Sequence, residues 1–147
     1  MSVWSAPITK GGGATPTVTD TPTGTADVGM AVLEYAGLAA AADASVVDQS
    51  ARASGTTGSS AATVSSGATG ATTSAGNLAV GFYVDSGFGD SLQGASGYTT
   101  RTNVSNTDDI ELLVQDQTVG LGATPASTFT TESATTWLAA VVVFKHA

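Results

Sequence analysis

The apolar residues of this sequence come in short runs that end at Gly, Pro, Asn or Ser. The longest run, Trp137 to Phe144, has eight residues. That length suits a buried strand, whereas a membrane-spanning helix needs about 20 apolar residues. No segment keeps the apolar repeat of an amphipathic helix for more than about one turn. We therefore expect an all-β fold in which turn residues separate many short strands.

The spacing of the runs favours an antiparallel β-sandwich of jelly-roll type with about nine or ten short strands. The expected strands are Ser2–Ala6, Thr15–Thr21, Val28–Tyr35, Val46–Ala53, Ala61–Ser65, Asn77–Asp85, Tyr98–Val104, Ile110–Gln117, Ser127–Thr131 and Trp137–Phe144. We treat residues 1–147 as a single sandwich domain, because this length suits one domain, with residues 1–13 as a candidate extended arm.

Val28–Tyr35 is a strong strand candidate because its residues alternate regularly. Its even-numbered residues face one side of the strand and its odd-numbered residues face the other. Both sets are largely apolar, so we expect this strand to be central in its sheet and covered on both faces. Asn77–Asp85 is equally strong, and its even-numbered apolar residues share one face.

Charged residues make up only 11% of the chain, against about 25% in an average soluble domain. The net charge is −8, from 12 acids and 4 bases. This charge repels phosphate, so we expect no nucleic-acid partner and no docking on anionic membranes. The sequence has no cysteine, which excludes disulfides and thiolate metal sites.

The first 13 residues lack the basic start and the apolar core of a secretory signal peptide. The composition is nevertheless like that of an extracellular protein. Two explanations remain open. The chain is a processed fragment, or it reaches the outside when the cell lyses, as virion proteins do.

Side chains suited to catalysis are scarce in this sequence. His146 is the only histidine and stands next to last, where chain ends are often mobile and cannot hold a general base in place. Asp108 and Asp109 are weak candidates for a Ca²⁺ site, because acids in a turn also bind backbone N–H groups. Their spacing matches no EF-hand. We expect no enzymatic activity, no metal and no cofactor.

Three aromatic residues lie beside predicted turns, namely Trp4, Phe88 and Tyr98. Exposed rings at such positions can stack on sugars, so these three are the candidate ligand-binding residues. The alternative is that all three pack inside the core, because aromatic rings bury large apolar areas. Trp137 and Phe144 suit core positions better, since they lie in the longest apolar run.

Three stretches of the chain contain motifs of a known kind of domain. Val32-Leu33-Glu34-Tyr35-Ala36-Gly37-Leu38 resembles the LEYSG strand of a β-sandwich family found in bacterial surface proteins and phage proteins. Thr73 to Gly81 is similar to its T-x-A-G-D-L-L-V-G pattern, and Trp137 to Lys145 is similar to its W-A-A-x-L-x-A-F-K ending. The resemblance spans residues 3–147. It implies a structural or adhesive domain without a shared enzymatic activity.

The family resemblance also implies further strands upstream of Ser2 to Pro7, near the point where Met1 stands. A sandwich without those strands has an unpaired Thr-rich edge, and such an edge accepts another strand. Val3, Trp4 and Val18 lie in the first two expected strands and are the candidate interface residues. The expected partner is a second copy of the chain, a virion shell or tail protein, or both.

Two functions are consistent with these observations. The first is a non-enzymatic structural protein on the exterior of a bacteriophage virion, as a capsid decoration or tail-associated protein that acts through protein–protein contacts. The alternative is a carbohydrate-binding or adhesion module of a secreted bacterial protein, whose partner is a cell-surface glycan. The expected location is the virion surface for the first and extracellular for the second.

Overall fold

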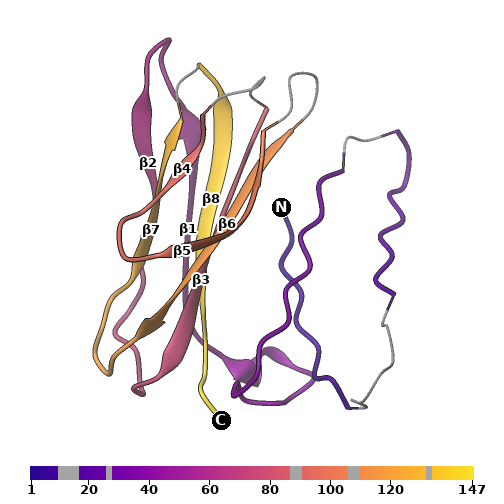
Figure 1. Cartoon of the computed structure of the whole chain (residues 1–147), viewed down its shortest axis with the longest axis vertical. Helices are drawn as coiled ribbons and strands as arrows, with labels where there is room; N and C mark the ends of the chain where they lie inside the picture. Colours follow the sequence, from indigo (N-terminus) through magenta and orange to yellow (C-terminus); the bar gives the residue numbers. More distant parts are fainter. Residues whose placement is uncertain (10–16, 26–27, 87–90, 106–109, 132–133) are drawn as a thin grey trace.

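The computed structural model describes residues 1–9, 17–25, 28–86, 91–105, 110–131 and 134–147 (Figure 1). Eight strands among these residues form two antiparallel sheets that pack against each other. The five-stranded sheet has the order β1-β8-β3-β6-β5, and the three-stranded sheet has the order β2-β7-β4. The strands are β1 Val47–Thr56, β2 Ala62–Ala68, β3 Asn77–Asp85, β4 Gln93–Gly94, β5 Thr99–Val104, β6 Glu111–Val119, β7 Ala126–Thr131 and β8 Thr136–Phe144. The predicted all-β sandwich is confirmed.

The strand pairs are nested along the chain. β1 pairs with β8, β2 pairs with β7, and β3 pairs with β6, all antiparallel. This is the pattern of one long hairpin that is rolled up so that successive pairs alternate between two sheets, which is a jelly roll. As a result β8, β3 and β6 each have a strand on both sides, and β1 and β5 are the edges of the larger sheet.

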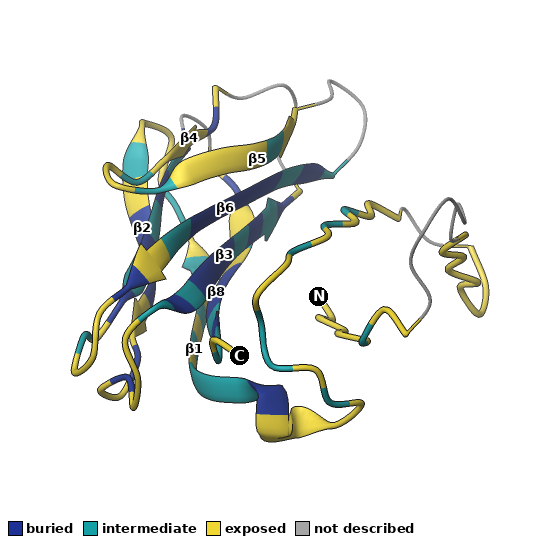
Figure 2. Cartoon of the chain, turned by 60° about the horizontal axis from the view of Figure 1, so that its bottom comes forward, coloured by how far each residue is buried: buried dark blue, intermediate teal, exposed yellow. Residues whose placement is uncertain are grey.

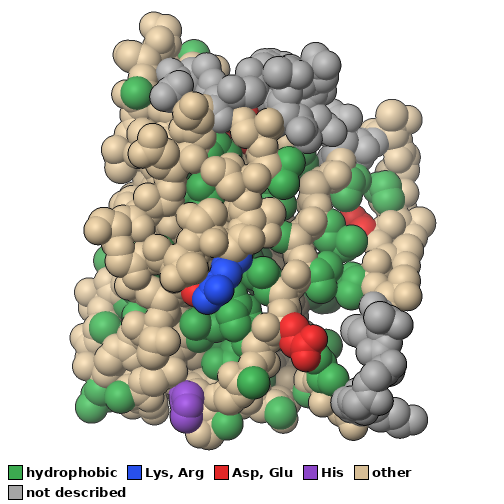
Figure 3. Space-filling model, viewed as in Figure 1, with side chains coloured by type: hydrophobic (Ala, Val, Ile, Leu, Met, Phe, Trp, Pro, Cys, Tyr) green, Lys and Arg blue, Asp and Glu red, His purple; other side chains and the backbone are tan. Residues whose placement is uncertain are grey.

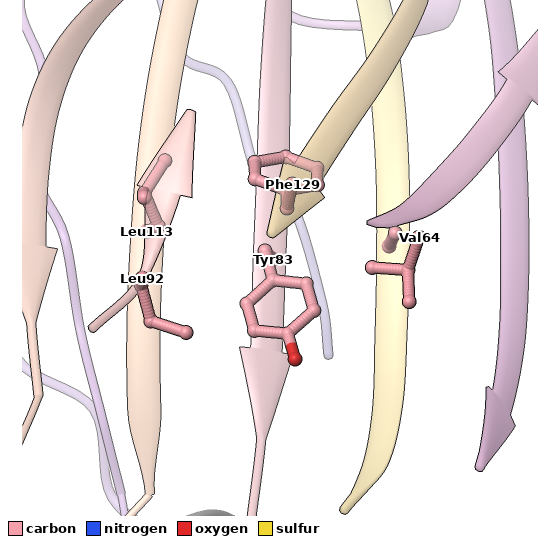
Figure 4. Close-up of a cluster of buried hydrophobic side chains, with 6 residues drawn as sticks. Val64, Tyr83, Leu92, Leu113 and Phe129 are labelled. Carbon is pink, nitrogen blue, oxygen red and sulfur yellow. The ribbon is translucent and has the colours of Figure 1, made fainter. Parts of the chain in front are cut away.

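The main core cluster lies between the two sheets. Its residues are Val64, Tyr83, Leu92, Leu113, Phe129 and Ala139. Figure 4 shows the Tyr83 ring, from the larger sheet, facing the Phe129 ring from the smaller one, and their centroids are 5.2 Å apart. Trp137, which the sequence placed in the core, packs half-buried against this cluster. Aromatic pairs of this geometry stabilise a core beyond the area that they bury.

A close approach between the sheets depends on Gly81. Gln115, opposite Gly81 on the neighbouring strand, is fully buried and donates to Ser127 Oγ at 2.7 Å and to the Thr128 carbonyl at 3.1 Å. A Cβ built on Gly81 would overlap Ser127 Oγ and lie 2.7 Å from Ser127 Cβ. Glycine at this position therefore lets the polar link between β6 and β7 form inside the sandwich.

The N-terminal region, residues 1–46, differs from its prediction. None of its described residues forms a strand, so the strands expected at Ser2–Ala6, Val28–Tyr35 and the described part of Thr15–Thr21 are wrong. Figure 1 shows this region beside the five-stranded sheet, on the side away from β2, β7 and β4. The chain crosses the face of the sheet and does not join an edge, so it finds no neighbouring strand for a hydrogen-bond ladder.

No helix in the described part of the chain is long and apolar enough to span a membrane. The helical structure assigned there is one short 3₁₀ turn, Ala44–Val46, which leads directly into β1. The side chain of Asp43 caps this turn by accepting from the Ser45 N–H at 2.8 Å.

Replacing Gly81 with Ala should destabilise the sandwich by about 1–3 kcal/mol, because the added methyl group meets Ser127 in a filled core. Chemical denaturation monitored by Trp fluorescence measures this loss. The matched control is Gly58→Ala, where a new Cβ meets nothing within 4 Å. The control should change the free energy of unfolding by no more than about 0.5 kcal/mol. Equal stability of the two variants would show that Gly81 has no packing role.

Candidate interaction surface

The outer face of the five-stranded sheet is the face turned away from the three-stranded sheet, and it is apolar. Because side chains alternate along a strand, the residues between the core-facing ones in β3, β6 and β8 point outward. They include Leu78, Val80, Phe82, Val84, Leu112, Val114, Leu138, Val142 and Phe144. Val80 and Val114 are only 1% and 0% exposed, so another part of the chain must cover this face.

The cover includes residues 28–36, which we call the covering segment. Its residues Ala31, Leu33 and Tyr35 are half-buried, whereas the residues between them are exposed (Figure 2). Gly29 lies so close to the sheet that an added Cβ would come 3.0 Å from Ile110 Cδ1. The alternation predicted for this stretch is therefore present, although no strand forms. One side of the segment faces the sheet and the other faces outward.

One polar cluster interrupts the apolar outer face. Asp116 is 3% exposed, and its carboxylate accepts two hydrogen bonds from Arg101, Nε to Oδ2 at 2.6 Å and Nη2 to Oδ1 at 3.0 Å. The Tyr35 hydroxyl donates to the same Oδ2 at 2.5 Å. Arg101 comes from the edge strand β5, at a bulge between Thr100 and Thr102. The cluster therefore joins β5, β6 and the covering segment at one point.

The ionisation of this cluster follows from its contacts. Burial by itself raises the pKa of Asp116, but the hydrogen bonds from Arg101 and Tyr35 outweigh it and hold the pKa of Asp116 below its ordinary value. Burial and the bond to Asp116 raise the pKa of Tyr35 well above its usual range. The bidentate bond to Asp116 likewise raises the pKa of Arg101. Asp116 is therefore a charged carboxylate and Tyr35 a neutral donor at neutral pH.

The covering segment is attached to the sandwich at its C-terminal end. Leu38 forms an isolated bridge with His146, the Ala39 N–H donates to the Lys145 carbonyl at 2.9 Å, and the Ala147 N–H donates to the Gly37 carbonyl at 2.9 Å. Gly37 has a φ of +78°, which a residue with a side chain rarely adopts. The chain therefore turns sharply at Gly37, beside its own C-terminus.

Exposed apolar side chains concentrate in the N-terminal region. Of the 11 large hydrophobic residues that are exposed in the described part of the chain, 8 lie there. These eight are Met1, Val3, Trp4, Ile8, Val18, Val28, Met30 and Val32. Figure 3 shows apolar side chains reaching the surface along and beside this region. The sandwich itself exposes only Val104, Leu121 and Leu138 among its described large hydrophobic residues.

The candidate interface residues Val3, Trp4 and Val18 all have exposed side chains, and Trp4 is 91% exposed. Val3 and Trp4 line one side of a shallow groove of about 180 Å³, and Val142 and Phe144 of β8 line the other. Trp4 thus contributes to the lining of a groove beside β1 and β8, although most of its side chain is exposed.

The two candidate ligand-binding residues that the structure describes, Trp4 and Tyr98, do not come together. Tyr98 is half-buried, its hydroxyl donates to the Ala126 carbonyl at 3.3 Å, and burial raises its pKa. It directly precedes β5, whereas Trp4 lies over β1, and these two strands are opposite edges of one sheet. Phe88 lies outside the described residues.

The acids that the sequence singled out, Asp108 and Asp109, also lie outside the described residues. No group of three or more His, Asp or Glu side chains in the described part of the chain is placed to hold a metal ion. Two buried acids, Asp85 and Glu111, are opposite each other on β3 and β6. Asp85 accepts from the Tyr83 hydroxyl and Glu111 from the Ser105 hydroxyl, each at 2.5 Å.

Sequence reasoning missed Tyr35, Arg101 and Asp116 as members of one cluster. Two signals were available. Asp116 is an acid that follows Leu112 and Val114 at alternate positions of an expected strand, and Arg101 is one of only 4 bases in the chain. Their pairing depends on the register between β5 and β6, which no spacing in the sequence reveals.

Comparison with family models, with curated proteins and with solved structures finds no match to this chain. The family resemblance drawn from the three sequence stretches therefore stays a prediction.

Replacing Asp116 with Asn should remove part of the pH dependence of stability. The folded-state pKa of Asp116 is lowered, so its contribution is full above the unfolded pKa of about 3.9 and is lost as the pH falls through the folded value. Urea unfolding at a series of pH values from about 6 to about 2 should show the gap between wild type and D116N shrinking as the pH falls. The control L121S alters an exposed side chain that has no ionisable group and should give a constant gap. A constant gap for D116N as well would contradict the role of the cluster.

Proposed function

We propose that this chain is a non-enzymatic structural protein on the exterior of a bacteriophage virion, as a capsid decoration or tail-associated protein, and that it acts through protein–protein contacts. The observation that carries the proposal is the concentration of exposed apolar side chains in the N-terminal region. The virion setting is supported by the family resemblance of the sequence, which links the chain to phage and bacterial surface proteins.

The distribution of apolar side chains supports a role in association. Soluble monomers rarely expose large contiguous apolar patches, and exposed patches mark interaction sites. Trp4, Met30 and Val32 are 91%, 52% and 61% exposed, and tryptophan is among the residues that contribute most to interfaces. These side chains have no role in the core of the sandwich, because they point away from it. A partner that covers them therefore gains apolar contact without disturbing the fold.

The charge distribution of the N-terminal region supports a protein partner in the same way. Residues 1–46 carry four acids, Asp20, Asp27, Glu34 and Asp43, and one base, Lys10. This excess of acids disfavours a polyanionic partner, and apolar contact is the proposed source of the binding energy.

The alternative, a carbohydrate-binding or adhesion module, has weaker support from the geometry. A sugar platform needs rings on one surface, whereas Trp4 and Tyr98 lie at opposite edges of the larger sheet. The Tyr98 ring is also half-buried and its hydroxyl is already hydrogen-bonded. Of the two candidate aromatic residues that the structure describes, Trp4 alone has a largely exposed side chain.

If the proposal holds, purified particles carry this protein in a fixed molar ratio to one shell or tail protein, as quantitative mass spectrometry can measure. The variants W4A and M30S should add back to particles that lack the protein about tenfold or more weakly, because each removes an exposed apolar anchor. L121S removes a side chain that is 70% exposed outside the N-terminal region, and it should bind like wild type. Finding the protein only as a free secreted monomer would contradict the proposal.

A further inference from the structure

We propose that the covering segment is exchanged between two copies of the chain, so that residues 28–36 of one copy lie on the outer sheet face of the other. The inference rests on the proposed function, a role carried out through protein–protein contacts, and it names a second copy as one partner. The acceptor is the outer face of β6 and of the start of β3, where the chain's own segment lies in the folded monomer.

The outer face is shaped for this particular sequence. Gly29 lies against Ile110, where a Cβ would already approach to 3.0 Å, so a small residue is needed at that point. Six residues further on, the Tyr35 hydroxyl reaches the Asp116 carboxylate that Arg101 holds in place. These two contacts set the register of any segment that binds there. A second copy of the chain has the small residue at position 29 and the tyrosine at position 35 that the two contacts require.

The covering segment is held in a way that allows exchange. Residues 28–34 make no hydrogen bond to any other described residue, whereas β3 is paired along its whole length with β6 and β8. Leaving the sheet therefore breaks side-chain contacts and the Tyr35–Asp116 bond, but no backbone ladder. The same contacts form again on a second copy, so the exchange changes the free energy of the folded chains little. The protein concentration then sets the ratio of monomer to exchanged dimer.

The attachment point provides a hinge. Gly37 and Ala39 are bound to the chain's own C-terminus, and the positive φ of Gly37 places a sharp turn where the segment leaves the sandwich. Nine residues in extended conformation reach about 30 Å, roughly the width of a small domain. A change of backbone angles next to Gly37 is thus enough to carry the segment to a neighbouring copy.

The dimer also gains contacts that the monomer lacks. In the monomer the outward row Val28, Met30 and Val32 is 45%, 52% and 61% exposed. In a two-fold exchanged dimer the two segments run between the same pair of domains, where their outward rows can pack against apolar surface of the partner chain. Glu34, the fourth residue of this row, is exposed and lies at its end, so packing of the other three need not bury a charge.

Cysteine trapping tests the exchange directly, because the wild-type chain has no cysteine. The variants G29C and I110C are mixed in equal amounts at high concentration under reducing conditions and then oxidised. Ile110 Cγ1, which approximates the position of the new sulfur, is 3.5 Å from the Cβ site of Gly29, close to the spacing that a disulfide requires. We expect a covalent dimer that contains one chain of each variant, joined between positions 29 and 110, on a non-reducing gel and in peptide mass spectra.

Two controls distinguish a specific exchange from random disulfide formation and from closure within one chain. G29C mixed with L121C, whose cysteine lies in an exposed turn, should give no more mixed dimer than random collision of exposed thiols. The double variant G29C/I110C in one chain should give both an internal disulfide and a covalent dimer whose share rises with protein concentration. If the double variant closes only within one chain at every concentration and the mixture forms no 29–110 link, the exchange is overturned.

The outcome is separable from that of the proposed function. Particles that carry the protein in a fixed ratio, together with an absence of 29–110 links, would overturn the exchange and leave the virion role intact. Mixed 29–110 dimers of a protein that no particle contains would support the exchange and contradict the virion role.

Discussion

A sheet that is apolar on both faces must be covered on both faces, and the arrangement of this molecule follows from that requirement. β3, β6 and β8 are central strands with apolar side chains pointing to either side. The three-stranded sheet covers one face and encloses the core around Tyr83 and Phe129. The N-terminal region lies over the other face. Without that second cover, side chains such as Val80 and Val114 would be exposed to water.

The two covers differ in how they are held, and this difference has consequences for dynamics. The three-stranded sheet is joined to the larger one by the core and by the buried Gln115, whose partners lie on β7. The covering segment instead has half-buried side chains and the polar contact of Tyr35 with Asp116. Regions with few buried contacts and no backbone ladder open at lower free energy than the core. The outer cover is thus the part of the molecule best suited to changing partners.

The same division separates the buried core from most of the exposed apolar side chains. The sandwich contains the buried aromatic pair and the paired strands, and it exposes few large apolar residues among those described. The N-terminal region contributes little to the interior but holds most of the exposed apolar side chains. The Arg101–Asp116 pair connects the two, because it is anchored in β5 and β6 and binds a residue of the covering segment. Under the proposed function, association through the N-terminal region would leave the structure of the sandwich unchanged.

The sequence by itself determined seven of the eight described strands, because short apolar runs between turn residues bury their side chains by pairing in sheets. It did not reveal β4, Gln93–Gly94, because these two residues carry no apolar pattern. The sequence also determined that successive side chains of Val28 to Tyr35 point to alternate sides, since this pattern depends only on consecutive residues. Only the tertiary structure decided that this stretch lies across a sheet face and forms no strand, because β1 and β5 are the edges of the larger sheet among the described strands and the segment forms no backbone ladder with either. The tertiary structure likewise decided that Tyr35, Arg101 and Asp116 meet. Their spacing in the sequence does not predict the register between β5 and β6, and this register brings Arg101 and Asp116 together.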